Sequence, residues 1–437
     1  MTRVLSADWL LPVDAPPLAD GALAIEDGRI AAVGTRSELG DGERFDGAAI
    51  VPGFVNAHSH LEYAVYAGFG EALEFVHWIA IHVERKRRVG WDDHLAGALV
   101  GAAECLASGV TTVGDASYSG AAGVACAELG LRGIVYLEVF GSDADEALDR
   151  FERSRARVEP VLSERVLLGV SPHTPFNISD EIYRACAELG LPVATHVSES
   201  GAELEWLRSG RGPLAGFSHR LVAPCGTSGV KRLARAEVLG PHIVAVHCVQ
   251  VDDEDIDLLA RHDVAVVHCP RSNALLGCGI APLEELRAAG IRVGVGTDSP
   301  ASAPSFDMFE ELRTAIYLAR ARARRADALT ASEVLELATL GSARTLALAD
   351  EVGSLTPGKR ADLAVVSLDG SPYLPWEDPA AAVVFGGSPE RVVLTAVDGE
   401  VRYKKGEFEW HELRRRAASA RSRLLDAVPA AAAAHSR

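Results

Sequence analysis

Short apolar runs rich in β-branched residues recur along the chain, and several of them end at a residue that can bind a metal. Runs of this length and composition predict strands, and stretches of helical pattern such as residues 283–289 lie between some of them. This alternation predicts βα units and a parallel sheet. The runs at 48–57, 191–195, 242–246 and 291–297 lead into His58, His196, His247 and Asp298.

Eight such strands can be placed in the middle of the chain. Reactive residues at the C-terminal ends of several strands are typical of a (β/α)8 barrel enzyme. A single residue of this kind is commonly a core histidine or a helix N-cap aspartate, but agreement among four strand ends favours a site. The strands are predicted at the segments ending at His60, His196, His247 and Asp298 and at residues 110–115, 133–140, 166–170 and 264–269.

The two chain ends carry a different pattern of short strands and turns. Residues 21–34 predict a hairpin that turns at Asp27-Gly28, and residues 361–366 and 392–401 predict further strands. Neither piece is long enough for a stable sheet alone, so we expect them to pair. The predicted fold is therefore α/β: a small β-sandwich with a C-terminal helix (1–52 plus 351–437) and an inserted TIM-like barrel (53–350).

Composition fits this architecture and limits the classes of partner that the protein is expected to bind. A barrel of about 250 residues plus a second module accounts for 437 residues. The formal net charge of −18 argues against binding nucleic acid or an acidic membrane surface. The cluster Arg85-Lys86-Arg87-Arg88 predicts the solvated end of a helix.

Cysteine usage and hydropathy predict a cytoplasmic protein. Seven cysteines, an odd number, are scattered without CxxC spacing, which favours reduced thiols over a disulfide framework. The N-terminal apolar run is too short for a signal peptide, and we expect no transmembrane segment.

His58 and His60 point to the same side of their strand, because side chains two apart share a face. With His196 and Asp298 they offer three imidazoles and one carboxylate, a set suited to Zn²⁺ or Fe²⁺. A divalent ion lowers the pKa of its water from ~16 toward ~7, which makes hydroxide available at neutral pH.

Such a nucleophile needs a proton shuttle, and three residues are candidates. Glu199 lies three residues beyond His196, where its carboxylate can reach both the water and a leaving nitrogen. Asp298 can take the proton of the water, and His247 can polarise the attacked centre. Taken alone, Glu199 is equally consistent with a solvated loop glutamate.

Together these motifs resemble the amidohydrolase superfamily, in its cytosine-deaminase-like branch. The branch includes adenosylhomocysteine, aminofutalosine and guanine deaminases and triazine hydrolases, and the resemblance covers nearly the whole chain. The segments that carry it are Val51-Pro52-Gly53-Phe54-Val55-Asn56-Ala57-His58-Ser59-His60, His196-Val197-Ser198-Glu199, Cys269-Pro270-Arg271-Ser272-Asn273, Thr297-Asp298-Ser299 and the return at 353–363.

The resemblance implies one metal ion, held by His58, His60, His196 and Asp298, with Zn²⁺ expected and Fe²⁺ as the alternative. It also implies the roles given above for Glu199 and His247, and a homodimer. Binuclear relatives carry a carboxylated lysine at the end of the fourth strand. Here that position reads Ser171-Pro172-His173, which supports one metal and leaves His173 to face the substrate.

The expected reaction is hydrolytic deamination of a small heteroaromatic amine, such as a purine nucleoside. The run His58-Ser59-His60-Leu61-Glu62 resembles aminofutalosine deaminases, so aminofutalosine is one candidate substrate, although Pro300 departs from the commoner leucine. Glu62 is expected to accept hydrogen bonds from the base or ribose, Trp78 to stack on the purine, and Arg271 to meet a carboxylate. Core packing explains Trp78 equally well, and bracing of a loop explains Arg271.

Two other readings stay open. One is hydrolysis of a different C–N or C–Cl bond on a triazine-, pterin- or pyrimidine-like ring, and the other is a metal-binding protein without catalysis. Signatures of other hydrolases are absent from the sequence, including H-E-x-x-H, G-x-S-x-G and the P-C-x-x-C half of the nucleobase deaminase motif.

Overall fold

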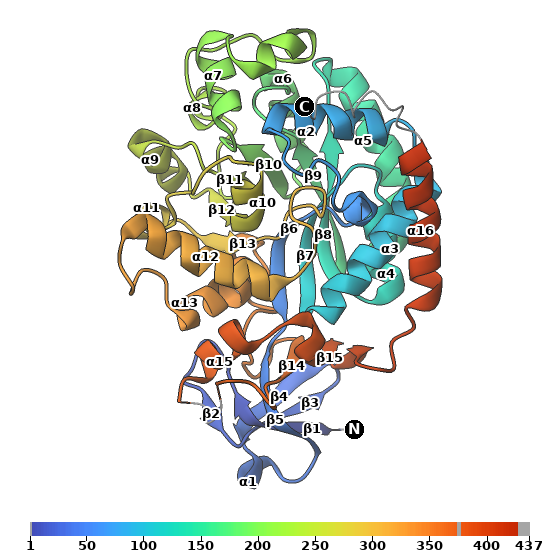
Figure 1. Cartoon of the computed structure of the whole chain (residues 1–437), viewed down its shortest axis with the longest axis vertical. Helices are drawn as coiled ribbons and strands as arrows, with labels where there is room; N and C mark the ends of the chain where they lie inside the picture. Colours follow the sequence, from blue (N-terminus) through green and yellow to red (C-terminus); the bar gives the residue numbers. More distant parts are fainter. Residues whose placement is uncertain (1, 374–376, 427–437) are drawn as a thin grey trace.

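A parallel barrel-like sheet forms the centre of the computed structural model, which describes residues 2–373 and 377–426. Its eight strands follow one another in chain order, as predicted (Figure 1). They are β6 (Phe54–Ser59), β7 (Val110–Ser117), β8 (Arg132–Val139), β9 (Val166–Pro172), β10 (Val193–Val197), β11 (Ile243–His247), β12 (Ala265–His268) and β13 (Val293–Val295).

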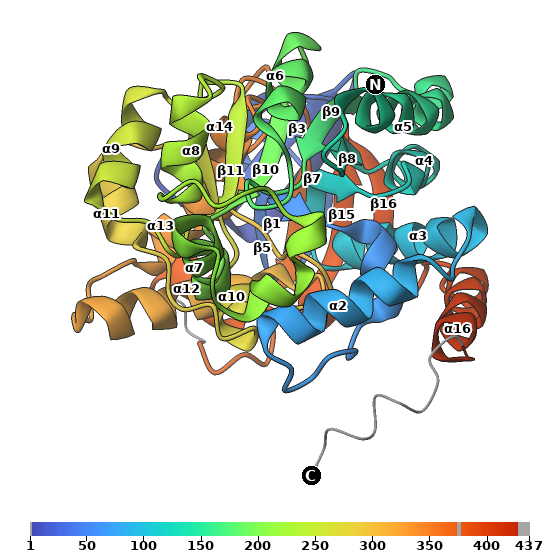
Figure 2. The same ribbon diagram turned by 90° about the horizontal axis from the view of Figure 1, so that it is seen from above.

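Helices surround these strands in the view from above (Figure 2). The strands are covered on both faces, which is why their sequences read as continuous apolar runs. The helices are α2 (Phe75–Lys86), α3 (Trp91–Ala107), α4 (Ala121–Leu129), α5 (Ala144–Val158), α6 (Asp180–Glu188), α7 (Gly201–Ser209), α8 (Gly229–Arg235), α9 (Asp253–Arg261), α10 (Pro270–Leu275), α11 (Leu283–Ala288), α12 (Met308–Ala323), α13 (Ala331–Glu336) and α14 (Ser342–Thr345), with the short turns η1 (Leu61–Tyr66), η2 (Glu159–Val161), η3 (Pro213–Arg220) and η4 (Leu337–Gly341).

The barrel is closed where β13 meets β6, through backbone and side chains together. The backbone N–H of Asp298 donates to the carbonyl of His58 at 3.0 Å. Asn56 binds both the backbone N–H (2.9 Å) and the hydroxyl (2.7 Å) of Thr297. A Cβ at Gly296 would lie 2.7 Å from the backbone nitrogen of His58, so only glycine permits this approach. The closure therefore brings Asp298 beside the histidines of β6.

The two chain ends join in one mixed eight-stranded sheet, the smaller body in Figure 1. β1 pairs in parallel with β5, and β5 in turn pairs antiparallel with β14 from the other end of the chain. The small β domain was expected as a sandwich. Its strands belong to one hydrogen-bonded sheet, in the order β16-β15-β14-β5-β1-β3-β4, and β2 pairs with β1 off this path. They are β1 (Arg3–Leu10), β2 (Leu18–Ala19), β3 (Gly21–Glu26), β4 (Arg29–Thr35), β5 (Glu43–Pro52), β14 (Leu363–Ser367), β15 (Val392–Val397) and β16 (Glu400–Lys404), with α1 (Arg36–Leu39), α15 (Pro379–Gly386) and η5 (Pro389–Arg391) between them.

The small sheet fixes the direction of the barrel. β5 ends at Pro52 and β6 begins at Phe54, so the N-terminal ends of the barrel strands face the small domain. Their C-terminal ends, with the candidate site residues, consequently lie at the opposite end of the molecule. The expected (β/α)8 barrel with a β domain built from both chain ends is confirmed.

The C-terminal helix α16 (His411–Asp426) departs from the expected grouping with the small domain. It packs along α3 of the barrel (Figure 1). Ala420 and Leu424 are buried, Arg421 donates to the backbone carbonyls of Val65 and Ala67, and Arg423 pairs with Asp93 on α3. An Arg/Ala-rich sequence predicts the helix but does not identify the surface that its few apolar residues bury.

Arg132 ties the barrel to the small domain through a buried ion-pair network. Its guanidinium donates to both carboxylate oxygens of Asp362, at 2.9 and 3.3 Å, and also to Asp398. Arg132 and Asp362 are nearly inaccessible to water. Removing the cation would leave the buried carboxylate of Asp362 with only the backbone N–H of Asp398, at 2.8 Å, and without a compensating charge. Breaking a buried ion pair by removing one partner is strongly destabilising.

We therefore expect Arg132→Met to lower the free energy of unfolding by about 3–5 kcal/mol, measured by urea denaturation. Arg3→Met is the matched control, because Arg3 pairs with Glu43 at the surface, where an ion pair contributes at most about 1 kcal/mol. Equal losses in the two variants would contradict the structural role of the network.

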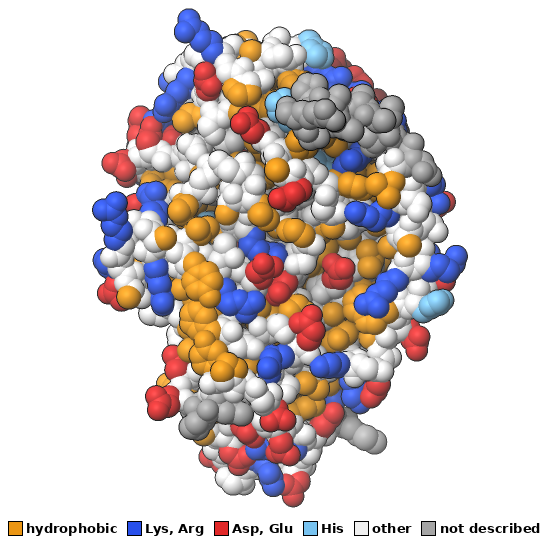
Figure 3. All heavy atoms as spheres, in the orientation of Figure 1, with side chains coloured by type: hydrophobic (Ala, Val, Ile, Leu, Met, Phe, Trp, Pro, Cys, Tyr) orange, Lys and Arg blue, Asp and Glu red, His pale blue; other side chains and the backbone are white. Residues whose placement is uncertain are grey.

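The structure bears on only some of the other expectations drawn from composition. The seven cysteines are all free, and among the described residues no helix is long and apolar enough to cross a membrane. Acidic and basic side chains are interspersed over the face shown in Figure 3. A cytoplasmic location, a homodimer and the absence of nucleic-acid binding stay predictions.

Candidate active site

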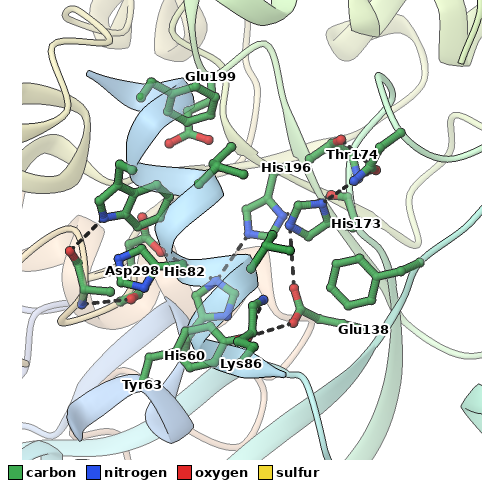
Figure 4. A pocket seen from close by; sticks show the side chains of 18 of the residues that line it. His60, Tyr63, His82, Lys86, Glu138, His173, Thr174, His196, Glu199 and Asp298 are labelled. Carbon is green, nitrogen blue, oxygen red and sulfur yellow. Dashed lines mark hydrogen bonds and ion pairs between the residues drawn. The ribbon is translucent and has the colours of Figure 1, made fainter. Parts of the chain in front are cut away.

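Six side chains from four strand ends converge on one point at the C-terminal end of the barrel. They are all buried, and several line one cavity (Figure 4). The imidazole centroid of His58 lies 4.9 Å from that of His60, 5.0 Å from that of His196 and 5.9 Å from that of His247. The set is His58 (β6), His60 (after β6), His196 (β10), Glu199 (after β10), His247 (β11) and Asp298 (after β13).

Four of these residues have donor atoms spaced as a metal site requires. Asp298 Oδ1 lies 3.5 Å from the Nε2 atoms of both His58 and His60, and the Nε2 atoms of His60 and His196 are 3.3 Å apart. Two ligands ~2.0–2.1 Å from a tetrahedral zinc are separated by roughly 3.3–3.4 Å. The buried Nε2 of His58 has no hydrogen-bond partner among the described residues. These donors fit one divalent ion.

Hydrogen bonds behind the donors fix their orientation. His196 Nδ1 donates to the carbonyl of His173 at 3.0 Å, which leaves the Nε2 lone pair facing the other ligands. Asp298 Oδ2 accepts from the hydroxyls of Ser272 (2.6 Å) and Ser302 (3.1 Å), so Oδ1 is free to face His58 and His60. Ser272 and Ser302 therefore hold the carboxylate in place.

Burial favours the neutral form of His60, His196 and His247, the form of an imidazole that binds a metal. Desolvation and the neighbouring histidines lower the pKa of His60 well below its usual value and that of His196 to about 4. Desolvation also lowers the pKa of His247 well below its usual value.

The pKa values of the two carboxyl groups in the site are shifted in opposite directions. Burial, followed by the charges of Asp298 and Glu203, raises the pKa of Glu199 well above its usual value. Burial alone would raise the pKa of Asp298, but contact with His58 and the nearby His247 and His60 lower it well below its usual value. Pairs of acids separated in this way are typical of an acid and a base in one mechanism.

Glu199 is held by the start of helix α7. Ser200 caps this helix, and the carboxylate of Glu203 accepts from the backbone N–H groups of Ser198 (2.8 Å) and Glu199 (3.0 Å). The Glu199 carboxylate thereby lies 3.7 Å from His247 Nε2. Ser200-Gly201-Ala202-Glu203 has the S-x-x-E spacing of a capping box, a signal by which the sequence could have identified Glu203.

Backbone strain accompanies the site. His247 and Asp298 adopt left-handed φ angles of 77° and 57°, which non-glycine residues rarely take. Such conformations persist where the surrounding structure enforces them, commonly at functional sites. Here they turn each chain sharply at its strand end and direct the side chain into the cavity.

Two of the four expected substrate residues line the cavity, and two do not. Trp78 on α2 and His173 after β9 both line it, and the Trp78 indole N–H donates to the carbonyl of Ala301 at 2.9 Å. Glu62 is instead buried behind the site, where it accepts from Ser117 and from the backbone of Ser119. The carboxylate is occupied by protein donors, which corrects its expected contact with substrate.

Arg271 also lies away from the cavity, contrary to the expected contact with a substrate carboxylate. Its guanidinium pairs with Glu310 at 2.9 Å and with Glu311, and donates to the carbonyl of Ser305 at 2.8 Å. It braces the start of α12 against α10, so its carboxylate partners belong to the protein.

The structure also places in the cavity wall residues that the pattern did not identify. Glu138 comes from the end of β8. A carboxylate within an otherwise apolar strand is the feature by which the sequence could have identified it. Lys86 lines the cavity too, and Arg85 is buried over the ring of Phe69. The basic cluster thus ends helix α2 as predicted, but only part of it is solvated.

Comparisons with known proteins identify the family of the chain and some of its relatives. Residues 49–402 match the sequence pattern described as "Amidohydrolase family". The chain is 32% identical to 5'-deoxyadenosine deaminase of Methanothermobacter thermautotrophicus over 91% of this chain and 92% of the relative. It is also 32% identical to 5-methylthioadenosine/S-adenosylhomocysteine deaminase of Symbiobacterium thermophilum, over 92% and 93%.

A solved structure extends the likeness to the fold. The zinc-bound adenosine deaminase from Xanthomonas campestris superposes with a TM-score of 0.85, at 27% identity over 97% of this chain and 98% of that one.

Proposed function

The chain belongs to the amidohydrolase family, and on this basis we propose that it is a metal-dependent hydrolytic deaminase that releases ammonia from an aminated purine nucleoside. The observation that carries the proposal is the convergence of six buried side chains at the C-terminal end of the barrel, where all but His58 line one cavity. They are His58, His60, His196 and Asp298, with Glu199 and His247 beside them.

The proposed ion is Zn²⁺, with Fe²⁺ as the alternative, held by three imidazoles and one carboxylate. When bound, a divalent ion supplies Lewis acidity and brings the pKa of water toward about 7. A mere binding protein has no need of the proton-carrying groups Glu199 and Asp298, so the complete set favours catalysis over storage of a metal.

The protein groups supply the proton transfers of deamination. Asp298 accepts a proton from the attacking water as its oxygen bonds to the carbon that bears the amine. Glu199 delivers its proton to the adjacent ring nitrogen, then takes up the proton of the new hydroxyl and passes it to the departing amine. The C–N bond breaks, the carbon–oxygen bond becomes a carbonyl, and ammonia leaves. The proton held by Asp298 then restores the protonated form of Glu199, so one water is consumed. His247 Nε2 faces the attacked centre and stabilises the oxygen there.

The cavity wall suits a flat ring. Phe75, Trp78, Phe140 and Phe176 line it with aromatic faces, and His173 adds a polar contact. The names of the two relatives, deaminases of 5'-deoxyadenosine and of 5-methylthioadenosine and S-adenosylhomocysteine, support an adenosine-derived nucleoside. Trp78 and His173 are the proposed ring contacts.

Ammonia release across a panel of aminated rings tests the proposal. The panel contains adenosine, 5'-deoxyadenosine, methylthioadenosine, adenosylhomocysteine, aminofutalosine, guanine and an aminopterin, with the zinc-loaded and the iron-loaded protein. We expect at least one adenosine-derived nucleoside to be turned over far faster than guanine or the pterin. If the metal-loaded protein released no ammonia from any compound in the panel, the purine proposal would be rejected in favour of hydrolysis of another C–N or C–Cl bond.

A further inference from the structure

Glu138 is a buried carboxylate in the cavity wall that the proposed chemistry does not use. Its side chain is almost fully shielded from water, and its Oε1 atom has no hydrogen-bond partner among the described residues. The other oxygen, Oε2, accepts a long bond of 3.4 Å from the Tyr63 hydroxyl. A buried carboxylate oxygen left without a donor is costly, so one that faces a cavity indicates a ligand that supplies the donor.

His173 stands next to this oxygen, and its neighbours determine which ring nitrogen carries the proton. The backbone N–H of Thr174 can only donate, and it lies 3.3 Å from Asn177 Oδ1, so this atom is the amide oxygen. The Asn177 amide nitrogen must then donate to His173 Nδ1, at 3.0 Å. The proton of the neutral ring consequently lies on Nε2, which is 3.8 Å from Glu138 Oε1 (Figure 4).

Lys86 balances the charge of this wall. Its ammonium donates to the Tyr63 hydroxyl at 2.8 Å and lies 4.9 Å from the centroids of the Tyr63 and Tyr118 rings. Burial raises the pKa of Glu138 to about 7, and the Lys86 charge opposes that rise. Lys86 and Arg150 are set against Glu138 and Glu62, so the charges around this wall balance, and it favours a neutral polar group over a phosphate or a carboxylate.

We propose that Glu138 Oε1 and His173 Nε2 form a hydroxyl subsite, in which a sugar hydroxyl of the nucleoside donates to Glu138 and accepts from His173. One oxygen can lie about 2.8 Å from both atoms, because they are 3.8 Å apart. The subsite rests on the proposed function and names its substrate class: ribosides, in preference to free bases and deoxyribosides. Glu138 is thus a specificity-determining residue.

Binding measurements test the subsite without relying on turnover. Calorimetry would compare adenosine with its 2'-deoxy and 3'-deoxy counterparts on metal-loaded protein that carries Glu199→Gln throughout, so that the nucleosides are not hydrolysed during the titration. In this background residue 138 is wild type, Glu138→Met or Glu138→Gln. We expect the wild type to prefer adenosine over at least one counterpart by about 10- to 10²-fold, the range for a hydrogen bond to a charged group. The preference should be lost in Glu138→Met and reduced in Glu138→Gln, whose amide oxygen still accepts. Glu138→Gln keeps the test decisive if the methionine variant does not fold.

Glu104→Met is the matched control, because Glu104 lies on α3, is also largely buried and does not line the cavity. We expect it to keep the wild-type preference. A wild type that binds all three nucleosides equally, or none, would overturn the subsite, as would an unchanged preference in both Glu138 variants. If the wild-type enzyme releases ammonia but its preference for adenosine does not depend on Glu138, only the subsite is rejected. If the preference depends on Glu138 but no ammonia is released, only deamination is rejected.

Discussion

Replacing Glu199 by glutamine should lower the turnover number by about 10²–10⁴-fold while the bound metal stays at the wild-type level. The amide keeps the size of the side chain and its place beside His247, but it cannot take up and release a proton. Glu199 is not among the four proposed ligands, so metal content should not change. Ammonia release and elemental analysis on the same preparation check both parts of this expectation.

Glu205→Gln is the matched control for this variant. Glu205 lies on helix α7, which begins just after Glu199, and is exposed outside the cavity. It should show wild-type turnover. A Glu199→Gln enzyme that retains full activity would rule out the shuttle, and a variant that has lost its metal would make Glu199 a ligand.

Removing the metal should abolish turnover and lower the thermal midpoint of unfolding. A cation that binds only the folded protein stabilises it by about 4 kcal/mol when present at about 1,000 times its dissociation constant. Without the metal, the lone pairs of the buried ligand atoms face one another. The Nε2 atoms of His60 and His196, for example, are only 3.3 Å apart. Dialysis against a chelator, followed by thermal unfolding and ammonia release before and after adding Zn²⁺, measures the effect.

The histidine variants sharpen this test. His196→Ala should bind metal at least about 10²-fold more weakly and should not recover activity when Zn²⁺ is added back. His242→Ala, at an exposed position just before β11, should recover as fully as the wild type. Full turnover by the metal-free protein would exclude a metal-dependent mechanism.

The sequence predicted most of the metal site because its residues belong to strongly patterned strands. His58 and His60 share one face of β6, and His196, His247 and Asp298 each follow a β-branched run. In a parallel barrel the C-terminal ends of all strands meet at one rim. Periodicity and topology together were therefore enough to bring these residues to one place.

Glu62 and Arg271 show where this reasoning stops. Glu62 follows His60 by two residues, and Arg271 precedes Ser272, whose hydroxyl binds Asp298. Both were expected to contact substrate. The structure gives each of them protein partners instead: Ser117 and Ser119 for Glu62, and Glu310 and Glu311 for Arg271. The partners of a charged side chain depend on residues distant in sequence, which a local motif does not contain.

Lys86 and Glu138 show the opposite error. Lys86 was assigned to a solvated helix end, and Glu138 went unnoticed within an apolar strand. They meet in the cavity wall only because α2 ends beside the rim to which β8 leads.

The sequence by itself predicted the barrel, the candidate metal donors and the glutamate beside them, because the period of each strand and the sequence of strands along the chain can be read locally. Only the tertiary structure decided which charged side chains face the cavity, how Gly296 and Asn56 close the barrel, and where α16 packs. Those outcomes depend on long-range contacts that compete for each buried polar group. The physical reason is that burial requires every charge to find a partner, and the fold determines which partner is within reach.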